Sequence, residues 1–263
     1  MKSRKRKRII TIDGPAGAGK TTVSKALSAR LGCVYVDTGS LYRGVAYEVC
    51  RCNVNWQDDG ELNALLASIS FELNLHPGGI YRLFSSGQDI TDYIRTPEIT
   101  MLSSDLSAKA AVRQALLDLQ REIASNSDAV FEGRDMGTVV FPDADYKFFL
   151  SADLKTRAVR RYNEIKQSEF LQTLDEPSIL EQPQPIFQQL ADVKGDIPDN
   201  KTTAEGHQAI DDIEKSISLR DKNDSSRDIA PLKPAPDAIM IDSTNLTPDQ
   251  VVDKIINCIL QHP

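Results

Sequence analysis

One octapeptide near the N-terminus constrains the fold of this chain more than any other segment: Gly14-Pro15-Ala16-Gly17-Ala18-Gly19-Lys20-Thr21. It fits the pattern G-x-x-x-x-G-K-[ST], which is the pattern of a phosphate-binding P-loop. Before it runs a short apolar stretch with Ile9, Ile10 and Ile12, and after it Thr22 to Leu31 has helical character. A strand that leads through a glycine-rich turn into a helix is the structural context that gives this pattern its meaning.

The P-loop residues predict a site for a polyphosphate. The glycines allow backbone N–H groups to approach phosphate oxygens, and the N-terminus of the following helix adds a favourable dipole. Lys20 is expected to reach the β- and γ-phosphates, and the Thr21 hydroxyl to help hold Mg²⁺. The expected contacts are Gly14, Pro15, Ala16, Gly17, Ala18, Gly19, Lys20, Thr21 and Thr22.

Charge is distributed unevenly along the 263 residues. The formal net charge is −7, but residues 164–216 hold twelve Asp and Glu against four Lys and Arg, so that the remainder is close to +1. An acidic total argues against a general nucleic-acid binder, and the near-neutral remainder leaves room for a local basic site that clamps phosphates. The basic N-terminal run at 2–8 is interpreted as a solvated tail.

Two further classes of protein are disfavoured by the composition. No stretch approaches the roughly 18 apolar residues that a membrane span needs. The four cysteines (Cys33, Cys50, Cys52 and Cys258) contain no C-x-x-C pair, and the three histidines lie far apart in the sequence. A zinc site and a disulfide framework are therefore not expected, and the thiols indicate a reduced, cytoplasmic protein.

Strand and helix patterns alternate along most of the chain. Apolar runs suited to parallel strands lie at 8–13, 33–37, 129–133, 146–151 and 238–243, and helical patterns lie at 20–31, 40–52, 59–68, 105–125, 154–162 and 248–260. This alternation predicts an α/β fold, a three-layer α/β/α arrangement of the P-loop NTPase type with a five-stranded parallel sheet. Ligands are then expected at the carboxyl ends of the strands.

Two segments break the alternation. Residues 71–95 alternate apolar and polar side chains around two glycine-containing turns, which predicts a small antiparallel excursion. Residues 167–216 are rich in Gln, Asp, Pro and Glu, with prolines at 177, 183, 185 and 198, so that this acidic insert is expected to be flexible.

Arginines recur around the expected site, whereas no Ser-His-Asp or Cys-His arrangement is present. Arginine binds phosphate oxygens in a bidentate way, so several arginines at the mouth of a P-loop fold predict two bridged phosphate groups. An acceptor that is itself a phosphate is already ionised and needs no general base. The protein then has to align the two groups and neutralise charge as the phosphoryl group moves.

The chain resembles the bacterial cytidylate kinases over about 9–165 and 217–260. The segments that carry the resemblance are Ile12–Lys20, Asp37–Arg43, Ile94–Glu98, Glu132–Ala144 and Ala230–Ala235, of which Glu-Gly-Arg-Asp-Met-Gly-Thr-Val-Val-Phe-Pro-Asp-Ala at 132–144 is long and specific. The resemblance implies transfer of the γ-phosphoryl group of ATP to CMP or dCMP with Mg²⁺ and without a general base. It also implies one domain: a core (about 8–40, 105–152 and 230–263), a monophosphate-binding part (41–104), and a lid with the acidic insert (153–229).

Site residues follow from the resemblance position by position. It implies that Thr38, Arg43, Arg134 and Arg227 bind the monophosphate, that Ser104, Arg113 and Asp135 read cytosine, that Arg220 and Asp224 hold the sugar, and that Arg157 and Arg161 act from the lid. The chemistry agrees, because a carboxylate accepts from the exocyclic amine of cytosine while a guanidinium donates to N3 and O2. Uracil presents a carbonyl where cytosine has the amine and should bind poorly.

The sequence departs from the family in two places, and it leaves alternatives open. The segment at 220–227 carries fewer charges than is usual in the family. The link between the lid arginines and Arg220, residues 162–219, is much longer than is usual in the family, which puts lid closure in question. A UMP or AMP kinase is the nearest alternative, and a nucleotide-binding protein with an impaired lid is another. A regulatory GTPase would need Asn-Lys-x-Asp, and the nearest string, Lys222-Asn223-Asp224, has the wrong order. No apolar heptad stands out, so a monomer is expected.

Overall fold

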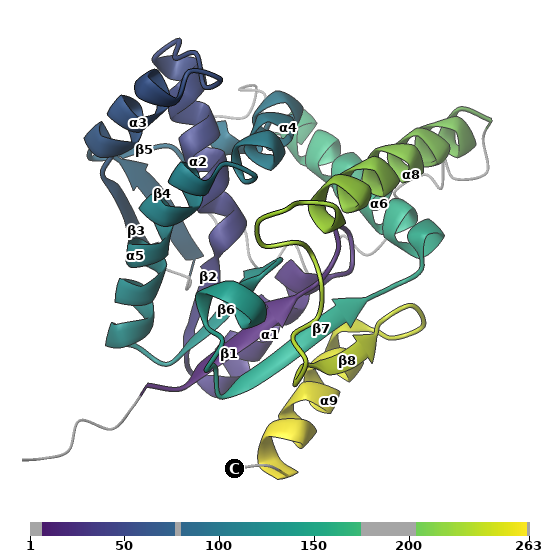
Figure 1. Cartoon of the computed structure of the whole chain (residues 1–263). Coiled ribbons are helices and arrows are strands. Elements are labelled where there is room, and N and C mark those ends of the chain that lie inside the picture. The colour runs from purple at the N-terminus through teal and green to yellow at the C-terminus, as the bar shows by residue number, and fades with distance from the viewer. Residues whose placement is uncertain (1–6, 77–79, 175–203, 262–263) are drawn as a thin grey trace, which may run out of the picture. The chain divides into compact units, whose positions relative to one another are not determined.

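The central sheet forms where the apolar runs predict it. The computed structural model describes residues 7–76, 80–174 and 204–261 (Figure 1). Its five-stranded sheet has the order β2-β6-β1-β7-β8, and every neighbouring pair is parallel. The strands are β1 (Ile9–Asp13), β2 (Val34–Asp37), β6 (Ala129–Gly133), β7 (Tyr146–Ser151) and β8 (Ile239–Asp242). The predicted five-stranded parallel sheet is therefore confirmed, with ends shifted by at most one residue.

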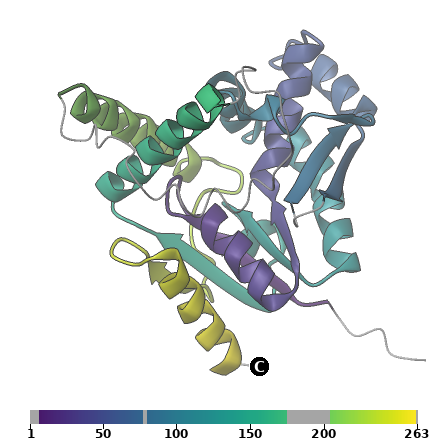
Figure 2. The ribbon, with the colours of Figure 1, turned by 180° about the vertical axis from the view of Figure 1, so that it is seen from behind.

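Helices cover both faces of this sheet, as an α/β/α arrangement requires. On one face, Ile10 and Ile12 of β1 pack in a buried cluster with α1 (Lys20–Leu31) and α9 (Pro248–Gln261). On the other, Val36 and Phe131 pack with α5 (Ala110–Asn126) and the π-helical turn η2 (Met136–Val140). Figure 2 shows α1 and α9 side by side over the sheet. The alternation along β1 puts Thr11 and Asp13 on the η2 face.

A second apolar cluster lies beside the sheet edge at β2. It joins α2 (Thr38–Arg51), α3 (Asp59–Ser68), α4 (Pro97–Leu106) and part of α5. The predicted antiparallel excursion is confirmed as a three-stranded sheet followed by the short helix η1 (Tyr93–Arg95). Its strands are β3 (Phe71–His76), β4 (Ile80–Ser85) and β5 (Gln88–Asp89).

The helix predicted over 105–125 begins later, at Ala110, because its first two residues belong to the end of another helix, α4. α4 begins at Pro97, where the Thr96 hydroxyl accepts a bond from the Ile99 amide, and it ends at Leu106. The Ser107 hydroxyl donates to the Ser104 carbonyl at 2.7 Å, which satisfies one of the last carbonyls of α4. α5 then starts at Ala110. Periodicity alone does not reveal this break, because apolar residues continue at helical spacing across it.

The chain forms two compact units, residues 1–152 with 220–263 and residues 153–219. In the second unit, α6 (Leu154–Leu174) and the first part of α8 (Ala204–Ser225) share a buried cluster. Tyr162 of α6 packs there with Ile210 and Ile217 of α8. The helix predicted over 154–162 continues to Leu174, and α8 includes 204–216 of the acidic insert, where no helix was predicted. The flexibility of the insert stays a prediction. Residues 175–203 lie outside the described part.

The predicted division into core, monophosphate-binding part and lid stays a prediction. The second unit ends at Leu219, whereas the predicted lid segment runs on to 229, so that Arg220, Asp224 and Arg227 belong to the first unit. All four cysteines are free thiols. Over the described ranges, no helix has the length and apolar character to cross a membrane.

We expect Leu27 to be a main contributor to the packing of α1 on the sheet. Leu27 is fully buried, so Leu27→Ala should destabilise the protein by about 2–5 kcal/mol through lost burial and a cavity. Leu260 of α9 is 71% exposed, and Leu260→Ala should change the free energy of unfolding by no more than about 0.5 kcal/mol. Urea unfolding of the two variants tests this. Equal losses would mean that α1 is not held by this cluster.

Candidate active site

The P-loop is a tight turn built against the ends of two strands. Gly14 has φ 148°, and a Cβ atom on it would lie 2.0 Å from the carbonyl oxygen of Leu150 on β7. Gly19 has φ 87° and caps the N-terminus of α1 in the left-handed region. Both positions therefore require glycine. From the end of β8, the Ser243 hydroxyl donates to the Ala18 carbonyl at 3.1 Å and braces the loop.

Lys20 is folded back onto the loop in this structure. Its Nζ donates to the Pro15 carbonyl at 2.7 Å, and the residue is 4% exposed. Burial lowers the pKa of the Lys20 amine to about 7, and the positive charge of Arg134 adds to this effect. A lysine with such a pKa is partly neutral near pH 7. A polyanion bound here would restore its charge.

Glu132, which the sequence analysis did not assign, lies at the centre of the site. It is the last residue but one of β6, and its carboxylate accepts from the Thr21 hydroxyl at 2.8 Å and from the Tyr35 hydroxyl at 2.7 Å. Its backbone carbonyl accepts from the Thr38 hydroxyl at 2.7 Å. Burial raises the pKa of the Glu132 carboxyl. The sequence did hold a signal for Glu132: this carboxylate lies at the carboxyl end of a predicted parallel strand, which is where ligands bind in such sheets.

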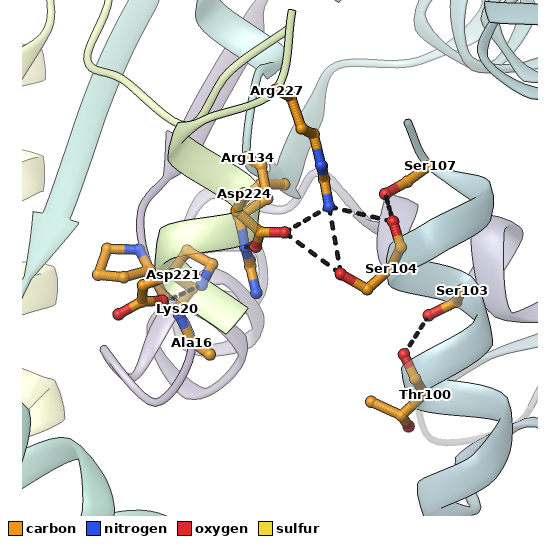
Figure 3. A network of polar contacts seen from close by, with 12 residues as sticks. Ala16, Lys20, Thr100, Ser103, Ser104, Ser107, Arg134, Asp221, Asp224 and Arg227 are labelled. Atoms are coloured by element: carbon orange, nitrogen blue, oxygen red, sulfur yellow. Dashed lines mark hydrogen bonds and ion pairs between the residues drawn. The ribbon is translucent and has the colours of Figure 1, made fainter. Parts of the chain in front are cut away.

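Asp224 connects the predicted phosphate and sugar residues. It is 2% exposed, accepts from Nε of Arg134 at 3.1 Å, and forms an ion pair with Arg227. The hydroxyl of Ser104 donates to it at 3.5 Å, and Arg227 also donates to the carbonyl of Ser104 at 3.3 Å. Figure 3 shows Arg134, Ser104 and Arg227 arranged around this one carboxylate. Next to it, Asp221 accepts from the P-loop amide of Ala16 at 3.4 Å.

Two further arginines, Arg43 and Arg220, are each partly buried and have a buried Nε donor without a hydrogen-bond partner within the described residues. Burial lowers the pKa of Arg220 to about 10, and the neighbouring Arg134 contributes to the shift. Guanidinium groups held this close to one another form a strongly positive site that an anion would stabilise.

Arg43 is held by Asp37, another carboxylate that the sequence analysis did not assign. Arg43 donates to Asp37 at 2.8 Å, and Asp37 also accepts from the Ser40 amide at 3.2 Å, which caps α2. Burial acts to raise the pKa of Asp37, but Arg43 and Arg95 outweigh it and hold the pKa below its usual value. Asp37 therefore stays ionised and fixes Arg43 at the start of α2.

The predicted cytosine readers are only partly brought together. Arg113 and Asp135 form a buried ion pair, with side chains 10% and 4% exposed. The Arg113 guanidinium also lies over the Tyr42 ring, 5.7 Å from its centroid. Ser104, in contrast, bonds to Arg227 and Asp224, on the side of the predicted phosphate and sugar residues.

The predicted lid arginines lie on α6 of the second unit. Arg157 is buried, and Arg161 donates to Glu164 at 3.0 Å on the surface of the same helix. They are four residues apart and therefore share one face of α6.

A cavity of about 690 Å³ lies beside the edge strand β2 and adjoins the site at Asp37. Leu73 and Leu83 of the antiparallel sheet line it together with Asp37 and Arg95. None of the residues predicted to bind nucleotide lines it. The candidate site is therefore assigned from the converging charged groups around the P-loop.

Asp13 is the third carboxylate that the sequence analysis left without a role. It ends β1, directly before Gly14, and is 4% exposed. Its two oxygens accept from the amides of Met136 at 2.9 Å and Gly137 at 2.8 Å. Burial raises the pKa of Asp13 to about 6, although both backbone bonds oppose the shift.

Comparison with known proteins identifies close relatives over nearly the whole chain. The family model described as cytidylate kinase matches residues 10–182 and 198–261. A cytidylate kinase of Geobacter sulfurreducens is 38% identical over 94% of this chain and 90% of its own length. A cytidylate kinase of Ligilactobacillus salivarius is 39% identical over 95% of both chains. One of Caldicellulosiruptor bescii is 37% identical over 94% of this chain and 93% of its own.

The raised pKa of Asp13 predicts a pH-dependent contribution to stability. The folded chain holds a proton on Asp13 up to about pH 6, whereas the unfolded chain releases it near 3.8, so stability falls as pH rises through that window. Asp13→Asn removes this titration. The free energy of unfolding of the wild type, minus that of the variant, should fall by about 2 kcal/mol between pH 4.5 and 7.5 in urea titrations. A difference independent of pH would contradict the assignment.

Proposed function

This chain belongs to the cytidylate kinase family, and from that premise we propose that it transfers the γ-phosphoryl group of ATP to CMP or dCMP with the residues gathered around its P-loop. One observation carries the assignment of the site. Asp221 of α8 accepts from the P-loop amide of Ala16 at 3.4 Å, and Asp224 on the same helix accepts from Arg134, so that the arginine cluster is held against the P-loop. This arrangement suits a reaction in which two phosphate groups meet.

On the donor side, the P-loop would hold the ATP phosphates. Backbone amides of 14–22 and Lys20 supply the positive potential, and Thr21 with Glu132 would hold Mg²⁺. The pair fits the ion, because a hydroxyl and a carboxylate are hard oxygen donors and the Thr21 hydroxyl already points at Glu132, 2.8 Å away. The bound ion would neutralise charge on the phosphate oxygens.

On the acceptor side, Thr38, Arg43, Arg134 and Arg227 would bind the monophosphate. The buried Nε donor of Arg43 supports this, since an anion would supply the partner that it lacks among the described residues. The acceptor oxygen is already ionised, so these side chains need only align it with the γ-phosphoryl group and screen the developing charge. Arg157 and Arg161 would complete this screening from the lid.

Cytosine recognition would rest on Arg113 and Asp135. In this structure the two are paired with each other, so that the base would insert its donor and acceptors between partners that are already aligned. Asp135 would accept from the exocyclic amine and Arg113 would donate to N3 and O2, with Ser104 alongside. Arg220 and Asp224 would hold the sugar. Uracil would place a carbonyl against a buried carboxylate, which is unfavourable.

The same proposal covers where and in what form the protein works. We infer a monomer that works in the cytoplasm with ATP and CMP or dCMP as its small-molecule substrates. The free thiols support a reducing compartment, and the charges of the proposed site all lie within the chain itself. The acidic insert is not required by the chemistry proposed here.

Base selectivity is the first test. Phosphorylation by ATP should be fastest with CMP and dCMP and much slower with UMP and AMP. Asp135→Ala should lower kcat/KM for CMP roughly 30- to 1000-fold, which corresponds to a loss of about 2–4 kcal/mol in transition-state stabilisation. It should also bring the rates with CMP and UMP closer together. A coupled assay with the four monophosphates measures both effects.

A surface aspartate on α5 supplies the matched control. Asp118 is exposed, and Asp118→Ala should leave all four rates unchanged. An unchanged CMP-to-UMP ratio in Asp135→Ala would refute the role of Asp135. Preference of the wild type for UMP or AMP would refute the substrate assignment itself.

Lys20 should take up a proton when ATP binds. Its pKa of about 7 leaves much of it neutral at pH 7 and more at pH 8, and the polyphosphate should raise that pKa. Calorimetric titration in buffers of different ionisation enthalpy should therefore show proton uptake that grows from pH 7 to pH 8. Lys20→Arg, whose side chain stays charged, should not show this growth. The same uptake in both proteins would rule out Lys20 as its source.

A further inference from the structure

Asp13 joins the two halves of the site through its backbone and its side chain. By sequence it is the residue before Gly14, so its position is set by β1 and shared with the P-loop. Its carboxylate bonds to the amides of Met136 and Gly137, the first two residues after Asp135. One residue therefore touches both the start of the donor loop and the segment that carries Arg134 and Asp135.

The segment that Asp13 holds has little freedom to move. A Cβ atom on Gly133 would lie 2.6 Å from Cγ of Met136 and 3.0 Å from the Thr38 hydroxyl. A Cβ atom on Gly137 would lie 3.0 Å from the Thr11 hydroxyl and 3.4 Å from the Asp13 carboxylate. The backbone from 133 to 137 is thus packed against β1 and α2, and a shift at its anchored end would be passed to the side chains between.

A carboxylate is an unusual choice for this anchor if folding were its only role. Burying a charge is unfavourable, and the two amides could be met at lower cost by less strongly hydrated acceptors. Both oxygens of Asp13 are engaged, one with each amide, at 2.9 and 2.8 Å. An asparagine in its place could accept from only one of them, since its amide nitrogen is a donor. Bonds to two fixed amides define the orientation of the Met136–Gly137 backbone relative to Asp13, whereas a single bond would leave that backbone free to rotate about it.

We propose that Asp13 is a positioning residue for base selection, which holds Arg134 and Asp135 in register with the P-loop through the amides of Met136 and Gly137. This inference rests on the proposed function, because it assumes that Asp135 reads the base of the acceptor. Asp13 itself touches neither nucleotide in this scheme. Its influence reaches the base through the backbone of 134–137.

The test is a comparison of kcat/KM for CMP and UMP in Asp13→Asn. Because a misplacement of about 1 Å can cost up to about a hundredfold, the CMP-to-UMP ratio should fall by about tenfold. KM for ATP should change by less than about threefold, since the P-loop keeps its own bracing from Ser243. The effect should vanish in an Asp135→Ala background, where the reader that Asp13 positions is already gone. A purely structural loss would persist in that background.

Two further variants keep the test decisive. Asp145, just before β7, accepts from the Ile9 amide at 2.7 Å, at the end of β1 opposite Asp13. Asp145→Asn makes the same chemical change away from the site and should leave the ratio unchanged. Gly137→Ala presses on the same anchored segment without altering the Asp13 carboxylate, and it should lower the ratio if Asp13→Asn does not fold.

The outcomes separate this inference from the proposed function. A wild type that does not prefer CMP to UMP refutes the proposed function. A wild type that prefers CMP, with an unchanged ratio in both Asp13→Asn and Gly137→Ala, overturns the inference alone. If Asp13→Asn raised KM tenfold for ATP and by the same factor for CMP, the inference would also be overturned, because Asp13 would then support the P-loop as a whole.

Discussion

The repulsion among clustered cations is the constraint on which this site depends. Besides burial, the neighbouring charges of Arg134, Arg43 and Arg227 lower the pKa of Arg220. Burial and the charges of Arg134 and Arg220 likewise lower the pKa of Lys20. At an effective dielectric constant of 20, each unscreened pair 4 Å apart opposes folding by about 4 kcal/mol. Such a cluster persists only where carboxylates are held among the arginines. Asp37 and Asp224 occupy those places.

The parallel sheet determines where these carboxylates can stand. Asp13, Asp37 and Glu132 are at or next to the carboxyl ends of three neighbouring strands, and the register pairs Asp13 with Gly133 and Asp37 with Glu132. Parallel strands end at one edge, so acidic side chains separated by up to 119 positions in sequence meet there. Burial at that edge raises the pKa of Asp13 and Glu132 and lowers that of Lys20, because it disfavours any charge.

The sequence predicted the parallel sheet and the positively charged site residues, but not the carboxylates that pair with these residues. The five strands are short apolar runs, of which β1 and β6 are buried throughout, and all five were predicted. The start of α5 was predicted about five residues too early, because the end of α4 at Leu106 depends on capping bonds rather than on periodicity. The helical part of the acidic insert was missed because composition outweighed the spacing of Ile210 and Ile217.

The carboxylates were harder to predict for a physical reason. A P-loop lysine or a phosphate-binding arginine belongs to a local pattern, whereas the partner of Arg134 is Asp224, 90 residues away. Only the fold sets such pairs. Glu132 was accessible in principle, since it precedes Gly133-Arg134 at the end of a predicted strand, but nothing local distinguishes it from a buried structural residue. Asp13 lay inside the quoted P-loop segment and was passed over for the same reason.

These internal ion pairs change what substrate binding has to accomplish. The arginines are already gathered and oriented by carboxylates, so a phosphate need not recruit mobile side chains from solution, and less rotamer entropy is lost on binding. When substrate binds, Asp224 is predicted to exchange its bonds to Arg134 and Arg227 for a bond to the sugar. The two arginines would then bind the phosphate, so that none of the three side chains is left unpaired. The free energy of binding is then the difference between two well-paired states. Selectivity follows from that difference, because a ligand that cannot replace every internal bond leaves a buried charged group without a partner.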